Sequence, residues 1–451
     1  MSITTFRGLL DWMDSQKLLA HVTRAVDPAY ELTTVQRKMQ SGPNLGLLFE
    51  NVKGSKLRVA CNIMSRREAV AASLGLTPTT MLPVLAERET KSLPLNEVTD
   101  APVHEVVFTG DAIDATRDLP QVVHSEHDAG AYITAGIFLA RDPASGVYNA
   151  SWNRTQIAGP AHMRTRMMPP QHLGQYQAAA ENAGQPLPVA CVIGAPPSVM
   201  LASSSKIPYD SDELQVAGAW QDSPLRVVRA KTQPLVVPAD AEIVIEGEIV
   251  PKVREEEGPF GEFLDSYVDI GRNHVFKVTA LTRRKDAIHH IMTAGGNEDL
   301  NLLSVMLQVE VWKAVSKHVK VHDVGCPAQI LGCAVSIHRT PDTDMQAVRR
   351  AVLEAHWWMK FVVIVDADVN VHDANEVLWA LHSRFTADGG IFHLPGVDTM
   401  PRRMTESGKQ ELSKGRLCLD ATYPPSLEPH FRRRRWPMLN DIKLEDYIGR
   451  Q

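Results

Sequence analysis

Several carboxylates surround a Gly-Pro pair in the segment Glu255-Glu256-Glu257-Gly258-Pro259-Phe260-Gly261-Glu262. Glycine and proline prevent a helix here, so the sequence predicts that Glu257 and Glu262 lie on a tight, stiff loop. One interpretation is a solvated acidic turn. The other is a pair of carboxylates facing one pocket, because Phe260 and the small residues allow close approach and local desolvation. A desolvated carboxyl group can keep its proton near neutral pH and deliver it to a carbanion.

A second polar stretch reads Tyr148-Asn149-Ala150-Ser151-Trp152-Asn153-Arg154, and Pro169-Pro170-Gln171-His172 follows it. Taken alone, Arg154 is interpreted as a surface cation and His172 as a histidine that starts a helix. A charged or metal-binding role for either residue needs further support from the rest of the chain.

A third stretch contains Ser203, Ser204 and Ser205, and Glu213 follows shortly after. These hydroxyls could cap a helix and do nothing else. They could equally donate hydrogen bonds to a phosphate together with backbone N–H groups. The run His124–Asp128 offers metal-ligating side chains, but its place in a polar loop before a strand favours a loop role.

Composition limits the class of protein. The chain has 451 residues, 44% of them hydrophobic and 22% charged, which indicates a folded protein of two or three domains. A net charge of −6 argues against general nucleic-acid binding. Five scattered cysteines without a CxxC pair indicate a reducing compartment. No uncharged run reaches the ~18 residues that a membrane span needs, and the N-terminus lacks a secretory pattern, so a cytoplasmic globular protein is expected.

The hydrophobic patterns predict three regions. Residues 1–105 are expected to form an α/β region that opens with an amphipathic helix at Phe6–Met13. Residues 106–300 are expected to form an antiparallel sheet or barrel with two helices. The strands are predicted at 104–108, 132–140, 188–193, 242–250 and 274–281, and the helices near 172–182 and 210–221.

Residues 301–451 are expected to form a separate α/β layer, because helix and strand patterns alternate there. Helices are predicted at 302–317, 345–359 and 374–385, and buried strands at 330–337 and 361–365. Glycine-rich nucleotide motifs of the GxGxxG and GxxxxGK types are absent from the sequence. A Rossmann cofactor or a nucleoside triphosphate is therefore not expected.

Taken together, these stretches resemble the UbiD family of reversible decarboxylases, which use prenylated flavin mononucleotide. The family pattern has an Asn before an Arg, Pro-Gln-His, Ser-Ser with a following Glu, Glu-Gly-Pro-Phe-Gly-Glu, and a Lys before a hydrophobic-Asp-Ala-Thr run. All five appear in that order. They are Asn149 with Arg154, Gln171-His172, Ser203-Ser204 with Glu213, Glu257 to Glu262, and Lys414 before Leu419-Asp420-Ala421-Thr422.

The resemblance implies a fold and a cofactor site. The fold would be α+β and α/β multidomain, with a central flavin-binding split β-barrel-like domain between the N-terminal α/β region and a C-terminal α/β oligomerisation domain with its tail. A divalent cation, Mn²⁺ or Mg²⁺, would be held by Asn149, His172 and Glu213 next to the flavin phosphate. A potassium ion would bind nearby. The cofactor-binding residues would be Asn149, Gln171, His172, Ser203, Ser204, Glu213 and Lys414.

The resemblance also implies the chemistry. Arg154, Glu257 and Glu262 would be the catalytic residues, with Glu262 the acid that protonates the adduct. The substrate would be an aromatic, heteroaromatic or α,β-unsaturated carboxylic acid. A flavin prenyltransferase would supply the cofactor, and a homodimer or larger homo-oligomer is expected. Met168 and Phe263 are predicted pocket walls because they flank these residues.

Two other functions remain open at this stage. A metal-dependent hydrolase could use a His, a Glu and an Asn around a metal-bound water. A non-catalytic flavin-binding assembly protein would bind flavin without releasing CO₂. The substrate, the physiological direction, the oligomer number and the identity of the divalent metal are not given by the residues.

Overall fold

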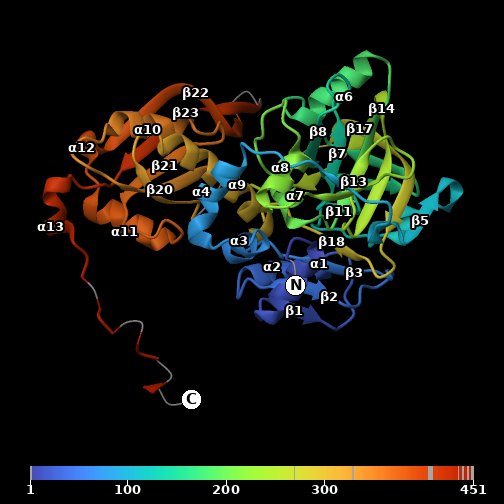
Figure 1. The fold of residues 1–451 in the computed structure, drawn as a ribbon, viewed down its shortest axis with the longest axis horizontal. Helices are drawn as coiled ribbons and strands as arrows, with labels where there is room; N and C mark the ends of the chain where they lie inside the picture. Colours follow the sequence, from blue (N-terminus) through green and yellow to red (C-terminus); the bar gives the residue numbers. More distant parts are fainter. Residues whose placement is uncertain are drawn as a thin grey trace. The chain divides into compact units, whose positions relative to one another are not determined.

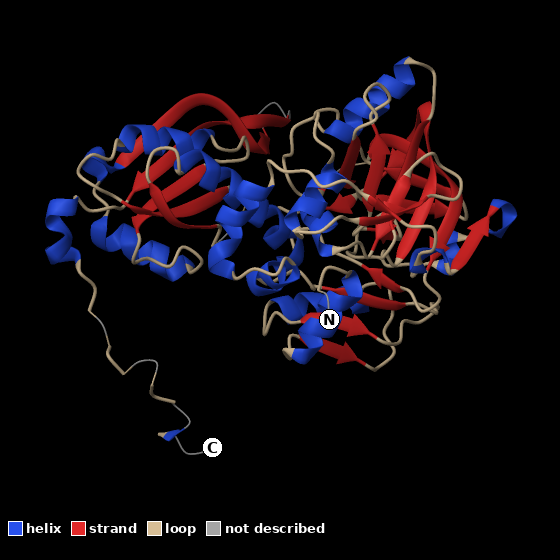
Figure 2. Cartoon of the chain, in the orientation of Figure 1, coloured by secondary structure: helices blue, strands red, loops and turns tan. Residues whose placement is uncertain are grey.

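The computed structural model describes residues 3–268, 270–327, 330–404, 410–434, 436–438, 441–443 and 446–447. The chain forms two compact units, Met1–Val309 and Glu310–Gln451. Figure 1 follows each unit along the sequence, and Figure 2 shows that strands dominate the middle of the first unit, whereas helices and strands are mixed elsewhere. Mixed α and β structure agrees with the predicted fold class.

The N-terminal part of the first unit is an α/β layer. Its first helix buries an apolar stripe, and the side chain of Thr5 caps that helix by accepting a hydrogen bond from the Gly8 N–H at 3.0 Å. Its sheet has the order β1-β2-β3-β18. The elements are α1 (Phe6–Ser15), β1 (Leu19–Val22), α2 (Glu31–Gln40), β2 (Gly46–Phe49), β3 (Arg58–Cys61), α3 (Arg67–Ser73), α4 (Pro78–Arg88) and β18 (Ile288–His290).

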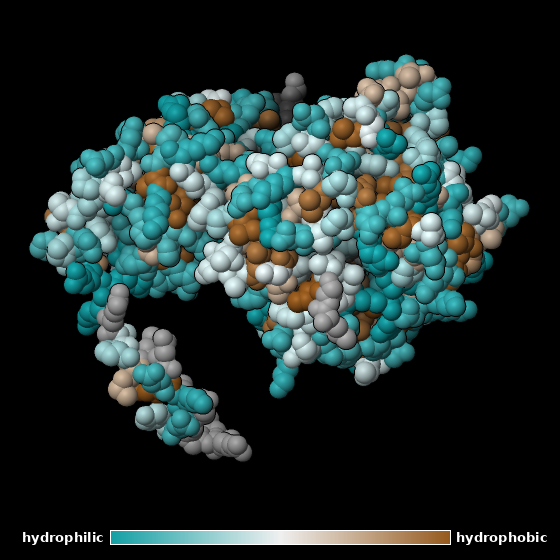
Figure 3. Space-filling view, viewed as in Figure 1, coloured by the Kyte–Doolittle hydropathy of each residue, from teal (hydrophilic) through white to brown (hydrophobic). Residues whose placement is uncertain are grey.

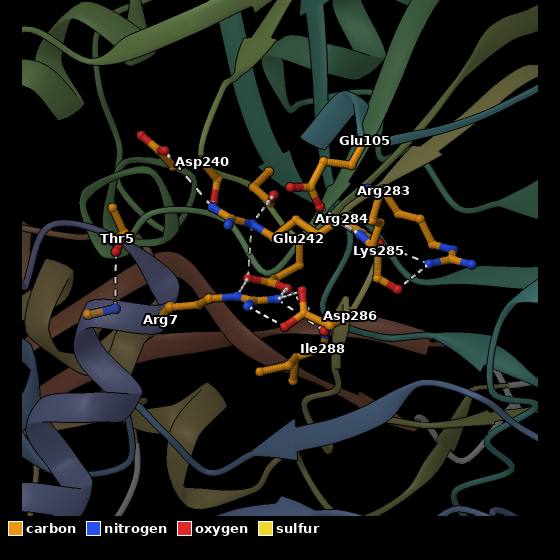
Figure 4. A network of polar contacts seen from close by, with 12 residues as sticks. Thr5, Arg7, Glu105, Asp240, Glu242, Arg283, Arg284, Lys285, Asp286 and Ile288 are labelled. Atoms are coloured by element: carbon orange, nitrogen blue, oxygen red, sulfur yellow. Dashed lines mark hydrogen bonds and ion pairs between the residues drawn. The ribbon is translucent and has the colours of Figure 1, made fainter. Parts of the chain in front are cut away.

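The strand β18 comes from far along the chain and pairs in parallel with β3. An ionic network fastens the first helix to the segment that leads into β18 (Figure 4). Arg7 donates to both carboxylate oxygens of Glu242 at 2.8 and 3.0 Å and to Asp286 at 2.7 Å. Glu242 is fully buried and also accepts a hydrogen bond from the Ile288 N–H at 2.9 Å. The strand pairing of β18 with β3 and the ion pairs of Arg7 therefore join the predicted central region to the N-terminal layer.

The middle of the first unit is an antiparallel sheet in the order β6-β9-β10-β17-β14-β11-β7-β8, with β5 beside β17. No pairing is described between β6 and β8, the two ends of this strand order. The split-barrel description stays a prediction. All five predicted strands are present, but residues 132–140 form two strands separated at Gly136, where a Cβ atom would lie 2.7 Å from the Cys191 sulfur. The strands are β5 (Val106–Thr109), β6 (Tyr132–Ile133), β7 (Ile137–Arg141), β8 (Tyr148–Trp152), β9 (Thr155–Gly159), β10 (His162–Thr165), β11 (Leu187–Ile193), β14 (Ile243–Glu257) and β17 (Gly271–Arg283).

Smaller elements complete the first unit. A three-stranded sheet has the order β13-β12-β4, and β15 pairs with β16. The predicted helices near 172–182 and 210–221 are α6 and α8. The bounds are β4 (Asn96–Glu97), α5 (Ala115–Asp118), α6 (His172–Asn182), α7 (Pro197–Ala202), α8 (Glu213–Trp220), β12 (Arg226–Arg229), β13 (Val236–Pro238), β15 (Phe260–Gly261), β16 (Tyr267–Val268) and α9 (Asn297–Val315), with 3₁₀ turns at Pro102–His104 and Gly110–Ala112.

The acidic segment is only partly a loop, which corrects the prediction for Glu257. The strand β14 continues through Glu257 because its backbone pairs with β17 up to Gly271. Glycine and proline end the strand one residue later, as Gly258 adopts a φ of 96° and proline cannot donate to a ladder. Glu257 is thus fixed by the sheet, whereas Glu262 lies in the turn beyond it.

The second unit is a five-stranded sheet in the order β19-β20-β21-β23-β22 with helices beside it. The predicted strands are present, the predicted helix at 345–359 ends at Glu354, and the long hairpin β22–β23 was not predicted. The oligomerisation tail stays a prediction. The elements are β19 (Lys320–Gly325), β20 (Gly332–His338), α10 (Met345–Glu354), β21 (Phe361–Asp366), α11 (Ala374–Arg384), α12 (Ala387–Gly390), β22 (Ile391–Met404), β23 (Gln410–Asp420), a 3₁₀ turn at Pro425–Leu427 and α13 (Glu428–Phe431).

The surface of each unit is mainly hydrophilic on the face drawn in Figure 3, with hydrophobic residues in small separate groups. Over the described part of the chain, no single helix is both long and apolar enough to cross a membrane. The bent pair α3 and α4 meets that test by length and composition.

Candidate active site

Arg154 lies between the two predicted acids and contacts both. Its Nε and Nη2 donate to the two oxygens of Glu257 at 3.1 and 2.9 Å, and its Nη1 donates to Glu262 Oε1 at 2.8 Å. Arg154 follows β8, whereas Glu257 ends β14. The structure therefore brings Arg154 to charge-assisted hydrogen-bond distance from two acids that lie about a hundred positions further along the sequence.

Glu257 is held from several directions. Its Oε1 accepts from the Tyr132 hydroxyl at 2.9 Å and its Oε2 accepts from Asn273 Nδ2 at 2.6 Å, in addition to the bidentate Arg154. Its side chain is fully buried. Burial, together with the nearby Glu257 carboxylate, raises the pKa of Tyr132, so this phenol stays a hydrogen-bond donor. Glu257 is thus a fixed anchor that orients the Arg154 guanidinium.

Glu262 is placed differently. Its N–H donates to the Ser266 carbonyl and its own carbonyl accepts from the Asp265 N–H, which makes a tight turn. Its side chain is 30% exposed, and among the described residues both hydrogen bonds to it end at Oε1, from Arg154 and from Arg166 at 3.1 Å. An acid that donates a proton to a substrate must be reachable in this way.

The His124–Asp128 run supports the acidic turn. Asp128 Oδ1 accepts from the Gly261 N–H at 3.0 Å, and the Ala129 N–H donates to the Pro259 carbonyl at 3.0 Å. The His124 ring lies edge-on to Phe260, and burial lowers the pKa of His124 to about 4. The imidazole is therefore neutral at physiological pH, and the run positions the turn.

The three predicted metal ligands also converge. Asn149 lies on β8, His172 is the first residue of α6, and Glu213 is the first residue of α8, where the Asp212 side chain caps the helix. Asn149 Nδ2 donates to both oxygens of Glu213 at 3.0 and 2.8 Å, and the Ala150 N–H donates to Glu213 as well. His172 Nδ1 is 3.6 Å from Glu213 Oε1.

This set has the properties of a ligand site. Asn149 Oδ1 is buried and has no hydrogen-bond partner among the described residues, although buried amide oxygens are normally paired. Burial raises the pKa of Glu213, while His172 and the Ala150 N–H oppose that rise. A cation would compensate both the orphaned oxygen and the buried carboxylate. Within the described part of the chain no three His, Cys, Asp or Glu side chains cluster as a metal site by themselves, so further ligands would be amide, phosphate or water oxygens.

The serine stretch adopts the helix-end arrangement. Ser203 and Ser204 follow α7, and the hydroxyls of both donate to the Met200 carbonyl, at 2.9 and 3.0 Å. Ser204 Oγ also accepts from Trp152 Nε1 at 2.9 Å. The Gln171 side chain is exposed directly before α6. Phosphate binding by Gln171, Ser203 and Ser204 stays a prediction.

Lys414 lies in the second unit. It is on β23, where its ammonium group pairs with Asp398 of the neighbouring strand β22 and is 60% exposed. Its predicted contact with a cofactor phosphate therefore stays a prediction. Met168 and Phe263 flank the site along the chain, and their role as pocket walls is likewise a prediction.

Sequence reasoning missed several residues of this site. Tyr132 and Asn273 hold Glu257, Arg166 contacts Glu262, and Asp128 holds the turn. Asp299 on α9 accepts from the Gly295 N–H at 2.8 Å, and burial together with the Glu262 carboxylate raises its pKa to about 6. Of these residues only Asp128 lies in a stretch that the sequence analysis singled out, the run His124–Asp128.

Comparison with known families covers most of the chain. Three models of the 3-octaprenyl-4-hydroxybenzoate carboxy-lyase UbiD match consecutive regions. They are the N-terminal domain at residues 10–89, the Rift-related domain at 96–297 and the C-terminal domain at 300–421. The chain belongs to the UbiD family. It is a UbiD-class carboxy-lyase.

Relatives in the UbiD family match nearly the full length of the chain. Anhydromevalonate phosphate decarboxylase of Methanothermobacter thermautotrophicus is 30% identical over 433 residues, 95% of this chain and 99% of that protein. The UbiD-class enzyme HmfF from Pelotomaculum thermopropionicum, solved in complex with FMN, is 34% identical and has a TM-score of 0.91 over 98% of this chain and 100% of its own. Vanillic acid decarboxylase of Sedimentibacter hydroxybenzoicus is 26% identical, with a TM-score of 0.84 over 96% of this chain and 95% of its own.

Proposed function

We propose that this UbiD-family protein is a reversible, non-oxidative decarboxylase of an aromatic, heteroaromatic or α,β-unsaturated carboxylic acid that uses prenylated FMN. The observation that carries the proposal is the bridge from Arg154 to Glu257 and Glu262. A structurally similar evolved dimeric form of HmfF was solved with prFMN, which supports the same cofactor here. We expect a cytoplasmic homo-oligomer.

The cofactor and its metal would be held by the residues that converge in the first unit. Asn149, His172 and Glu213 supply an amide oxygen, an imidazole and a carboxylate, a mixed set that suits Mn²⁺ or Mg²⁺ and leaves positions for a phosphate and water. A potassium ion is expected nearby. Gln171, Ser203, Ser204 and Lys414 are the remaining candidates for cofactor contacts, the lysine as a charge partner of the phosphate.

The protein's own residues would perform the acid–base work. Loss of CO₂ leaves electrons that no ordinary side chain accepts, and bound prenylated flavin supplies the electron sink. Arg154, fixed by Glu257, would attract the substrate carboxylate and orient it. Glu262, reachable at the turn, would protonate the carbon that has lost CO₂ and would then regain a proton from solvent. The reverse direction requires Glu262 to accept that proton.

Three acids make a direct test of the proposed function. The protein would be co-expressed with a flavin prenyltransferase, and CO₂ release would be measured with vanillic acid, 3,4-dihydroxybenzoic acid and anhydromevalonate phosphate, which the names of its relatives indicate. We expect a flavin absorbance spectrum and CO₂ release that depends on the cofactor. A pure protein that binds flavin and releases no CO₂ from any aromatic, heteroaromatic or unsaturated acid would support the assembly-protein alternative.

A further inference from the structure

Tyr176 lies one helical turn beyond His172 on α6, so the two side chains share a face of that helix. The side chain of Tyr176 is fully buried and belongs to a hydrophobic cluster of the first unit. Its hydroxyl has no hydrogen-bond partner among the described residues. Because a buried hydroxyl without a partner is costly, we expect a bound group to complete its hydrogen bonding.

The ring of Tyr209 connects Tyr176 to the predicted cation site. It lies edge-on to His172, with 5.1 Å between the ring centroids, and edge-on to Tyr176 at 5.4 Å. Tyr209 comes from the segment between α7 and α8 that also carries Ser203 and Ser204. These ring contacts fix Tyr176 on the side of α6 that presents the imidazole.

Carboxylates act on the Tyr176 hydroxyl from several directions. Burial raises the pKa of this phenol, and the carboxylates of Glu213, Asp142 and Asp212 add to that rise. The phenol therefore keeps its proton and lies in a region of negative potential. Such a region repels a phosphate group and attracts a cation together with the water molecules that the cation holds.

Two buried oxygen atoms near Glu213 thus lack a partner. Asn149 donates to Glu213 through Nδ2, and its Oδ1 is left unpaired. The second atom is the Tyr176 Oη, on which the Glu213 carboxylate acts more strongly than the other two carboxylates. A cation between them would satisfy the amide oxygen directly, and one of its water molecules would satisfy the phenol.

We propose that Tyr176 is a positioning residue of the cation site: its hydroxyl holds a water molecule that is a ligand of the divalent cation. This rests on the proposed function, in which Asn149, His172 and Glu213 bind that cation, and adds a fourth residue that acts through water. A phenol oxygen accepts a hydrogen bond readily from water that a cation polarises. Mg²⁺ and similar cations keep several water ligands in such sites, and Tyr176 would orient one of them.

The chain offers a matched control in Tyr148. Its phenol is also buried, on β8 directly before Asn149, but its oxygen accepts a hydrogen bond from the Val236 N–H at 2.7 Å. Y148F therefore removes a phenol oxygen that the protein itself uses, whereas Y176F removes one that the protein leaves unpaired. In the absence of metal and flavin, Y148F should lower the melting temperature, and Y176F should keep or raise it.

The test compares the affinity of the wild type, Y176F and Y148F for Mn²⁺. Each full-length protein would be freed of metal by chelation, saturated with FMN and titrated with Mn²⁺, and free Mn²⁺ would be counted from its electron paramagnetic resonance signal. Loss of a group that orients a metal ligand predicts that Y176F raises the dissociation constant about tenfold or more. Y148F should keep the wild-type dissociation constant.

The outcomes separate this inference from the proposed function. Weaker Mn²⁺ binding by Y176F alone, in a protein that releases no CO₂, would support the inference and remove the proposed decarboxylase function. The same Mn²⁺ dissociation constant in Y176F and wild type would overturn the inference and leave that function standing. Equal weakening in Y176F and Y148F, or a wild type that binds no Mn²⁺, would also overturn it. A metal-free Y176F that melts below the wild type would show a structural role for the hydroxyl and would likewise overturn it.

Discussion

Two clusters of the first unit are both built from arginines and carboxylates, but they differ in how accessible their carboxylates are. The Arg7 cluster (Arg7, Glu242, Arg284 and Asp286) surrounds a fully buried carboxylate, and the Arg154 cluster (Arg154, Arg166, Glu257 and Glu262) contains one buried and one accessible carboxylate. In the Arg7 cluster both oxygens of Glu242 are engaged by side chains or by the Ile288 N–H. In the Arg154 cluster only Glu257 is closed in that way.

The number of carboxylate oxygens that are hydrogen-bonded separates a structural role from a catalytic one. A carboxylate that accepts hydrogen bonds at both oxygens is fixed in place and connects elements, as Glu242 connects the first helix to the segment before β18. A carboxylate held at one oxygen from one side keeps the other side for a proton and a substrate. The comparison therefore predicts that variants of the two clusters fail in different assays.

The largest change in stability is expected from E242Q. Removing the charge leaves Arg7 and Arg284 facing a neutral amide in a buried place, and breaking a buried pair costs about 3 kcal/mol. The free energy of unfolding from a denaturant titration should fall by that amount, while the activity of the folded fraction is unchanged. D286N is the control, because the Asp286 side chain is 62% exposed and its loss should cost much less. Equal losses in both variants would contradict the contrast.

A smaller change, in cofactor content, is expected from H172A. Glu213 resembles Glu242 in its burial, but its neighbour Asn149 keeps an unpaired oxygen that fits a cation. Loss of the imidazole should lower flavin occupancy at least about tenfold, since metal affinity falls by 10–100-fold for changes around such sites. Flavin absorbance per protein checks this. H162A, which removes a partly exposed histidine paired with Glu255, should keep full occupancy, and a fully loaded H172A would refute the metal assignment.

The smallest effect is expected from D299N and has a defined pH dependence. Burial, together with the Glu262 charge, raises the pKa of Asp299 to about 6 in the folded protein. The folded state therefore binds this proton more tightly than the unfolded state, and stability falls as the pH rises from about 4 to above 6. D299N removes that penalty. Thermal unfolding should show it more stable than wild type at pH 7.5, by on the order of 1 kcal/mol, and equal at pH 4. A variant less stable at pH 7.5 would contradict this.

The sequence predicted the local elements around the site better than the contacts between its distant segments. The Gly258-Pro259 break and the acids around it correctly marked the turn, and the buried strands of the central sheet followed from their β-branched and aromatic residues. The position of Glu257 on β14 depends on its pairing with β17, a register between distant segments that no local pattern encodes. Arg166 and Asn273 escaped notice for the same reason.

The second unit illustrates the same limit. Its strands β20 and β21 are continuous apolar runs and were predicted, whereas the strand pattern of β22 and β23 is interrupted by Pro395, Gly396 and Gly415. The Arg7 cluster was not predicted either, because Glu242 and Asp286 are more than 200 residues away from Arg7 in the sequence and contact it only after folding.

The measurement that tests the account most directly is the turnover and the unfolding free energy of E262Q side by side. Glu262 is the accessible acid of the Arg154 cluster, so its amide should lower the rate of CO₂ release by about 10²–10⁴ while flavin content and unfolding free energy stay at wild-type values. Wild-type turnover by a flavin-loaded E262Q, or a loss of stability as large as that of E242Q, would contradict the assignment of the proton donor and with it the contrast between the two clusters.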